Sequence, residues 1–205
     1  SYGGIGQYLI ATSSWIILVR ILSEFGDSAV AGYQIAIRLI VFSLLPSWGL
    51  SNAAATMVGQ NLGAKKPDRA ERSVWKTAFI NVVFLMFFAV LFIYDSEFFI
   101  RLFVDDIVVI EFGAKALRII SFGYLCYAFG MVMPQAFNGA GDTATPTWIN
   151  FFSFWMIQIP IAYLLALEFG WEEDGVFVSI VIGETVLAIL GIWLFRRGKW
   201  KLKKV

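Results

Sequence analysis

The residues best able to carry chemistry are two charged side chains inside long apolar segments. Arg38 lies about ten residues into the apolar run that begins at Ala29, and Glu184 lies about eleven residues before Phe195, where another run ends. A helical rise of about 1.5 Å per residue would place both near the middle of a hydrocarbon layer about 30 Å thick. A lone charge there costs on the order of 3 kcal/mol or more. We therefore expect Arg38 and Glu184 to interact, directly or through water.

Other polar residues in the same runs are candidates for a transport pathway. Glu184 is the only carboxylate well inside any run, which makes it the best local candidate for a proton carrier. Gln34 lies one helical turn from Arg38, and Asn150 lies two turns from Gln158, so each pair is expected on one helix face. Tyr33, Gln34, Asn150 and Gln158 could hydrogen-bond a substrate, but groups of this kind more often hold helices together.

The positions of two prolines and one polar turn suggest where the helices bend and end. Pro46 and Pro160 lie within apolar runs and are expected to kink their helices at a cavity or a gate, although kinks also occur in helices that never move. Gly63 is placed to end a helix, and Pro67 to begin the next, a short interfacial segment over residues 67–74. Gln60 and Asn61 are expected to cap or pin this cytosolic turn. The segment lacks the spacing of a phosphate loop.

Six apolar runs must position these residues. Of the 205 residues, 59% are apolar, and the mean hydropathy of +0.75 is far above that of a soluble domain. The runs are long enough to cross a membrane, and they cover residues 5–22, 29–58, 76–94, 116–133, 147–167 and 176–195. The expected fold is an all-α membrane protein, a bundle of six transmembrane helices.

Charged residues in the connections predict the orientation of this bundle. Cations cluster after the second and sixth runs, whereas the connections after the first, third and fifth runs are rich in Asp and Glu. Six alternating helices put both basic clusters on one side, expected to be the cytosol, together with both ends of the chain. Residues 196–205 would form a basic cytosolic tail, and Lys115 and Arg118 break the pattern. Basic residues gathered at membrane ends suit anionic lipid and do not indicate nucleic acid.

Several kinds of chemistry are not expected. The chain has no His and one Cys, Cys126. A zinc site, an intrachain disulfide and a bound cofactor are therefore not expected. No nucleophile stands beside a base, so the chain is not expected to be an enzyme.

Three segments resemble the multidrug and toxic compound extrusion (MATE) family. They are residues 29–74, which include the motif VGQNLGA, residues 134–152 and residues 193–201. Members of the family have twelve transmembrane helices in two pseudosymmetric lobes and export cationic or amphipathic compounds by antiport with H⁺ or Na⁺. The resemblance implies that residues 1–205 form one lobe, helices seven to twelve, in a prokaryotic plasma (inner) membrane. The partners would be an N-terminal six-helix lobe, the lipid bilayer and small cationic or amphipathic substrates.

The chain also departs from the family and leaves alternatives open. Some branches carry a carboxylate in the seventh helix and another in the tenth, but residues 5–22 and 116–133 have none. That cation site is expected to be absent, and the main coupling residue can then lie in the other lobe. A chain that begins almost inside a span is expected to be a fragment, with a self-assembling half-transporter as the alternative. A lipid-linked precursor flippase of the same superfamily, which a large basic cavity would favour, and a non-transporting membrane scaffold subunit are the alternatives.

Overall fold

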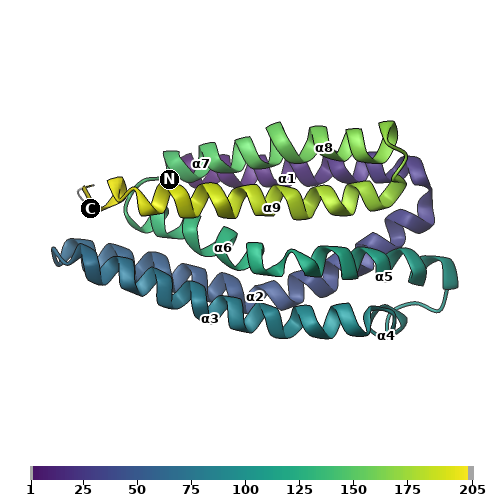
Figure 1. Ribbon diagram of the computed structural model, residues 1–205, viewed down its shortest axis with the longest axis horizontal. Helices are drawn as coiled ribbons and strands as arrows, with labels where there is room; N and C mark the ends of the chain where they lie inside the picture. The colour runs from purple at the N-terminus through teal and green to yellow at the C-terminus, as the bar shows by residue number, and fades with distance from the viewer. Residues whose placement is uncertain (1, 203–205) are drawn as a thin grey trace.

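The computed structural model describes residues 2–202 of the chain, so Lys203 and Lys204 of the predicted tail lie outside the described residues. All regular structure in the described range is helical (Figure 1), which confirms the predicted fold class. The elements are α1 (Tyr2–Leu22), η1 (Ser23–Phe25), α2 (Asp27–Gly63), α3 (Pro67–Tyr94), α4 (Ser96–Arg101), α5 (Ile107–Phe122), α6 (Tyr124–Gly139), α7 (Ala144–Asn150), the π-helix η2 (Phe151–Gln158), α8 (Ile159–Tyr163), the π-helix η3 (Leu164–Glu168), α9 (Glu172–Arg196) and η4 (Lys199–Leu202).

The helices pack into an elongated bundle whose long axis most of them follow (Figure 1). In the described residues, five helices are long and apolar enough to cross a membrane, and the bent pair α5–α6 makes a sixth candidate. One of the five is the continuous helix over residues 144–168, in which α7, η2, α8 and η3 follow one another. Counting the bent pair as one span, the number of spans agrees with the six predicted.

The fourth span differs from the straight helix predicted over residues 116–133. It begins at Ile107 and bends by 59° between α5 and α6. The backbone N–H of Gly123 donates to Ile120 O at 2.9 Å, a tighter bond than the α-helical one and typical of a helix end. A Cβ at Gly123 would lie 3.3 Å from the side chain of Val181, so glycine lets α9 approach the bend.

The segment over residues 67–74, predicted to be interfacial and to lead into the third span, continues into that span without a break. These residues are the first turns of α3, which continues to Tyr94. Pro67 occupies the first helical position, where its missing N–H costs nothing, and neither Pro nor Gly occurs in the rest of the helix. The polar start and the apolar span are therefore one helix of 28 residues.

The ends of α2 and α6 share one hydrogen-bond pattern. At α2, Lys66 N donates to Asn61 O at 2.8 Å and Lys65 N to Leu62 O at 2.9 Å, while at α6 the corresponding donors are Asp142 N and Gly141 N. Lys65 and Gly141 have positive φ of 58° and 77°, as this C-terminal motif requires. Gly63 is the last residue of α2, as predicted, but Lys65 adopts the left-handed conformation.

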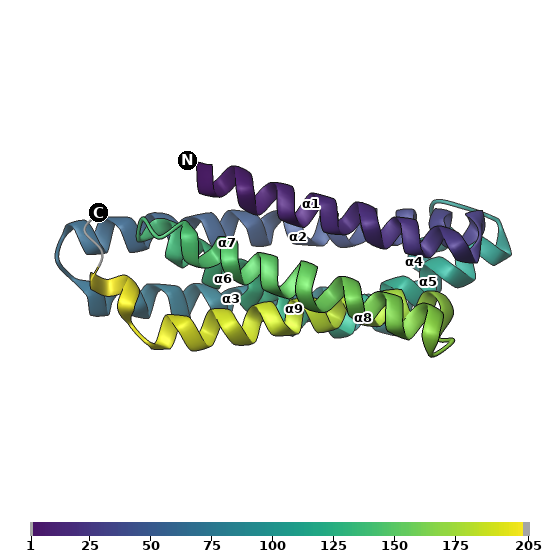
Figure 2. The ribbon, with the colours of Figure 1, turned by 90° about the horizontal axis from the view of Figure 1, so that it is seen from above.

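The two ends of the bundle carry different charges. The α2–α3 turn, the α6–α7 turn and the C-terminal segment lie at one end, and the connections after α1, α4 and η3 lie at the other (Figures 1 and 2). Lys201 Nζ lies 2.6 Å from Glu71 Oε2, so the two basic clusters share one end. We call the first the basic end and the second the acidic end.

The helices form two groups. The first group comprises α2, α3, α5 and α6, and the second comprises α1, α9 and the helix over residues 144–168. The groups join where α6 and α5 pack on α9. Pro46 lies inside a continuous α2, and Pro160 follows the π-helix η2, so the helical register changes at Pro160. Both prolines are exposed on the outside of this chain.

Candidate functional site: two cavities that meet at Glu184

Two cavities lie between the helix groups, and Glu184 lines both of them. Their volumes are about 170 Å³ and about 290 Å³. Four residues line both: Ala11, Tyr127, Phe154 and Glu184. By position along the helices, the smaller cavity extends toward the acidic end and the larger one toward the basic end. Glu184 therefore lies where the two cavities meet, between their acidic and basic sides.

The Glu184 carboxylate stands halfway along α9 and opposite a glycine. Glu184 is the thirteenth of the 25 residues of α9. A Cβ at Gly130 of α6 would lie 3.1 Å from Glu184 Oε2, so the absence of a side chain there makes room for the carboxylate. No ion pair or hydrogen bond joins this carboxylate to any described residue. An intramembrane carboxylate without a partner is costly unless it takes a proton or a cation, which makes it a functional candidate.

Gln158 and Ser14 add further oxygens to the smaller cavity. Gln158, at the end of the π-helix η2, is 5% exposed, and its Oε1 has no hydrogen-bond donor. Ser14 of α1 is 2% exposed, and its Oγ also lacks a partner among the described residues. Unpaired buried acceptors are costly and rare, and π-helical turns often occur at functional sites. These unpaired oxygens suit a ligand that donates hydrogen bonds or carries positive charge.

An aromatic contact closes the smaller cavity on its acidic side. Trp15 Nε1 donates to the Tyr33 hydroxyl at 3.1 Å, which ties α1 to α2. The Tyr33 ring also stacks on Phe177 of α9, with centroids 5.9 Å apart. Tyr33, a predicted site residue, thus lines the cavity and joins three helices.

A network of side-chain amides closes the larger cavity on its basic side. Gln7 Nε2 donates to Asn138 Oδ1 at 3.1 Å, and Asn138 Nδ2 donates to Gln7 Oε1 and to Gln135 Oε1, each at 3.3 Å. Gln7 and Gln135 line the cavity, together with the predicted Asn150. Sequence reasoning missed this network, because Gln7 and Asn138 are 131 residues apart.

The predicted direct contact between Arg38 and Glu184 is not formed. Arg38 is exposed on α2, no described residue forms an ion pair with it, and it lines neither cavity. Gln34, one turn earlier, also lines neither cavity. The reason is helix rotation: Tyr33 and Ile37 turn toward the cavity, which leaves the side chain of Arg38 on another face. A part for Arg38 and Gln34 in transport stays a prediction.

The remaining predicted residues lie away from the cavities. Asn61 Nδ2 donates to Met57 O at 2.7 Å within α2, and Gln60 O accepts from Ala64 N at 3.0 Å, so both belong to the turn at the basic end with Gly63. Residues that sequence reasoning missed instead line the cavities: Gln7, Ser14, Trp15, Tyr127 and Gln135. A polar residue at a cavity cannot be distinguished in the sequence from one that joins two helices.

The chemistry of the lining limits what the site can hold. In the part of the chain that the structure describes, no three His, Cys, Asp or Glu side chains gather as metal ligands. Around Glu184 the lining instead offers carboxylate, amide and hydroxyl oxygens beside aromatic rings. Such a site suits a proton, a monovalent cation or an organic cation.

A bundle of apolar helices with a broken span, and with an unpaired carboxylate between two cavities, defines the class of helical membrane transporters. Comparison with known proteins gives the family. The MatE family profile matches residues 5–164, and the chain belongs to that family. It is an integral membrane protein related to multidrug efflux transporters.

Curated relatives of similar sequence carry one kind of name. The probable multidrug resistance protein NorM of Thermotoga maritima is 25% identical over 199 residues, covering 97% of this chain and 43% of that protein. The protein of the same name from Mannheimia succiniciproducens is 29% identical over 188 residues, covering 90% of this chain and 40% of that protein. The chain thus spans less than half the length of these relatives.

Solved structures share the fold. A MATE structure in complex with MaL6 matches 99% of this chain with a TM-score of 0.91 and 21% identity, over 46% of its own length. The MATE transporter ClbM in complex with Rb⁺ matches 97% of this chain with a TM-score of 0.90 and 21% identity, over 47% of its own length. The six-span bundle therefore corresponds to one lobe of such a transporter.

Proposed function

We propose that this chain is one lobe of a membrane antiporter that exports cationic or amphipathic compounds in exchange for H⁺ or Na⁺. The observation that carries the proposal is the unpaired carboxylate of Glu184 where the two cavities meet. Family membership and the names of the curated relatives support export of toxic compounds as the activity. Glu184 takes and releases the coupling cation, and Tyr33, Asn150 and Gln158 line its path.

The second lobe and the orientation belong to the same proposal. This chain supplies helices seven to twelve, and an N-terminal lobe of six helices completes the central cavity between the lobes. Rocking of the lobes opens that cavity to one side at a time. The basic end faces the cytosol of a prokaryotic cell, with residues 196–205 as a cytosolic tail, because short basic connections stay inside.

The charge of the lining favours this function over the alternatives. The two cavities contain one carboxylate and neither Lys nor Arg among their lining residues. A flippase for a lipid-linked precursor must hold anionic phosphates, for which a basic lining is needed. A scaffold subunit gains nothing from buried acceptors without donors, such as Gln158 Oε1, since each lowers the stability of the fold.

Replacement of one carboxylate tests the proposal. Glu184→Gln is introduced into the protein as its gene encodes it, and export of a fluorescent cationic dye is followed in cells that lack other exporters. Proteoliposomes with an imposed H⁺ or Na⁺ gradient then identify the coupling ion. We expect dye export to be lost at a normal membrane level. Glu111→Gln, an exposed carboxylate at the acidic end, is the control and should retain export. Unchanged export and ion coupling in Glu184→Gln would reject the role of Glu184.

A further inference from the structure

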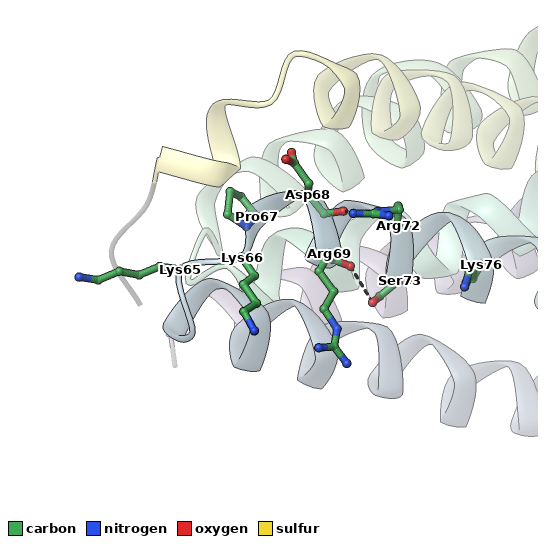
Figure 3. A pocket seen from close by; sticks show the side chains of 8 residues that line it. All are labelled: Lys65, Lys66, Pro67, Asp68, Arg69, Arg72, Ser73 and Lys76. Atoms are coloured by element: carbon green, nitrogen blue, oxygen red, sulfur yellow. Dashed lines mark hydrogen bonds between the residues drawn. The ribbon is translucent and has the colours of Figure 1, made fainter.

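A groove at the basic end is lined mainly by cationic side chains. It lies where α2 ends and α3 begins and has a volume of about 730 Å³ (Figure 3). Five of its eight lining residues are cations: Lys65, Lys66, Arg69, Arg72 and Lys76. None of the five forms an ion pair with a described residue. Their charges are therefore available to an anion from outside the chain.

The two carboxylates beside this groove form ion pairs with a lysine of the C-terminal segment. Lys201 Nζ lies 2.6 Å from Glu71 Oε2 and 3.4 Å from Asp68 Oδ1. In Figure 3, Asp68 points toward the C-terminal segment, whereas Lys66, just before α3, and Arg69 point to the opposite side. We call these two ion pairs the tail clamp. Without the tail clamp, two unpaired carboxylates would lie within the first two turns of the same helix and weaken the positive potential of the groove.

Packing holds the tail clamp in place. Trp200 is 1% exposed, although it lies close to the end of the chain. Its ring stacks on Phe195 with centroids 4.7 Å apart, and its Nε1 donates to Phe195 O at 2.9 Å. Because Trp200 precedes Lys201 directly, the buried indole fixes the start of the lysine side chain beside α3.

The groove lies at the level of the lipid headgroups. The exposed apolar surface of α3 begins at Phe79, which is 69% exposed, and continues at Ile80 and Val83. Phe79 follows Lys76 by three residues, or about 4.5 Å along the helix axis. Hydrocarbon chains that contact Phe79 would thus carry their phosphates next to the groove.

We propose that this groove binds the phosphate headgroup of an anionic phospholipid, and that the tail clamp makes the groove more selective by offsetting part of the negative charge of Asp68 and Glu71. A cluster of four or more cations beside a span attracts anionic lipid, and Arg and Lys both bind phosphate oxygens. A soluble phosphate compound would meet the same cations, but only a lipid also explains the adjoining apolar surface. The inference is independent of which compound the transporter exports.

The test measures lipid selectivity at the protein surface. The protein as its gene encodes it is reconstituted into phosphatidylcholine membranes, and electron paramagnetic resonance compares the bound fractions of spin-labelled phosphatidylglycerol and spin-labelled phosphatidylcholine. We expect a preference for phosphatidylglycerol that weakens at high salt. Lys66→Ala/Arg69→Ala should reduce this preference by roughly fivefold for each cation removed. Arg197→Ala/Lys199→Ala removes the same charge at the same end but outside the groove, and should change it much less.

Two further variants test the tail clamp in opposite directions. Lys201→Ala should lower the preference, although Lys201 does not line the groove. Asp68→Asn/Glu71→Gln should raise it, a gain that misfolding cannot produce. Equal effects of the groove and control variants, or displacement of the labelled lipid by millimolar inorganic phosphate, would overturn the lipid site. An unchanged preference in both clamp variants would overturn the role of the tail clamp.

Discussion

The side chain of Gln158 lies against the backbone of Gly183, the residue that precedes Glu184 in α9. A Cβ at position 183 would be 2.7 Å from Gln158 Oε1 and 3.0 Å from Gln158 Cδ. This contact brings the end of the π-helix η2 to the middle of α9, and Gln158, whose amide oxygen has no donor, lines the same cavity as Glu184. The shape of the candidate site thus depends on the absence of one methyl group.

Gly183→Ala should therefore displace Gln158 and change transport. The added methyl group forces a buried side chain to move, which costs about 1–3 kcal/mol of stability. We expect a lower melting temperature in detergent and a higher KM for dye export at a normal membrane level. Gly49→Ala is the matched control, because a Cβ at Gly49 meets nothing within 4 Å. Wild-type melting and wild-type KM in Gly183→Ala would contradict the contact.

Arg38→Gln should leave the coupling ion and its stoichiometry unchanged. Arg38 is exposed, and neither cavity includes it, so its charge is not needed to hold Glu184 in place. The measurement is the uptake of H⁺ or Na⁺ per exported dye molecule in proteoliposomes, compared with wild type. If coupling is lost while export continues, Arg38 acts on the carboxylate after all.

Gly139→Ala should disrupt the basic end of the bundle. A Cβ at Gly139 would lie 2.7 Å from Ala55 Cα, and backbone atoms cannot move aside as a side chain can. Overpacking of this kind costs about 3 kcal/mol, which should lower the melting temperature clearly. In Gly63→Ala the added methyl group meets nothing within 4 Å, so this variant should melt like wild type or slightly higher. Equal melting of the two variants would show that α2 and α6 do not approach so closely.

The tail clamp should persist across the neutral pH range. The hydrogen bond to Glu71, with the nearby charge of Asp68, raises the pKa of Lys201 above its ordinary value of 10.5. A raised lysine pKa stabilises the folded state fully below the ordinary value, and this stabilisation is lost as the pH rises through the folded pKa. Spin labels on Leu202→Cys and Ser73→Cys, in a Cys126→Ser background, should keep one distance from pH 6 to pH 9 and separate only above about pH 10.5. A distance distribution that broadens at pH 8 would contradict the raised pKa.

Global melting should hardly change over the same pH range, since a solvated ion pair contributes at most about 1 kcal/mol.

The sequence was sufficient for the class of the protein and for the arrangement of its ends. Apolar runs of transmembrane length and the placement of Lys and Arg are local properties of the chain, and they predict the spans and which connections share an end without any knowledge of packing. For the same reason the turn after Gly63 could be recognised from its residues alone. Glu184 could also be identified as a candidate from the sequence, because no other acidic residue lies so deep inside an apolar run.

Only the tertiary structure decided which polar residues meet. A run of apolar residues determines neither how its helix is rotated about its own axis nor which other helix packs against it. Each step of one residue along a helix changes the direction of the side chain by about 100°. Rotation of α2 therefore brings Tyr33 to the cavity and leaves Arg38 outside, and α9 packs close to the bend at Gly123. The contacts of Gln7 with Asn138 and of Lys201 with Glu71 join residues more than a hundred positions apart, and such contacts exist only once the helices have packed.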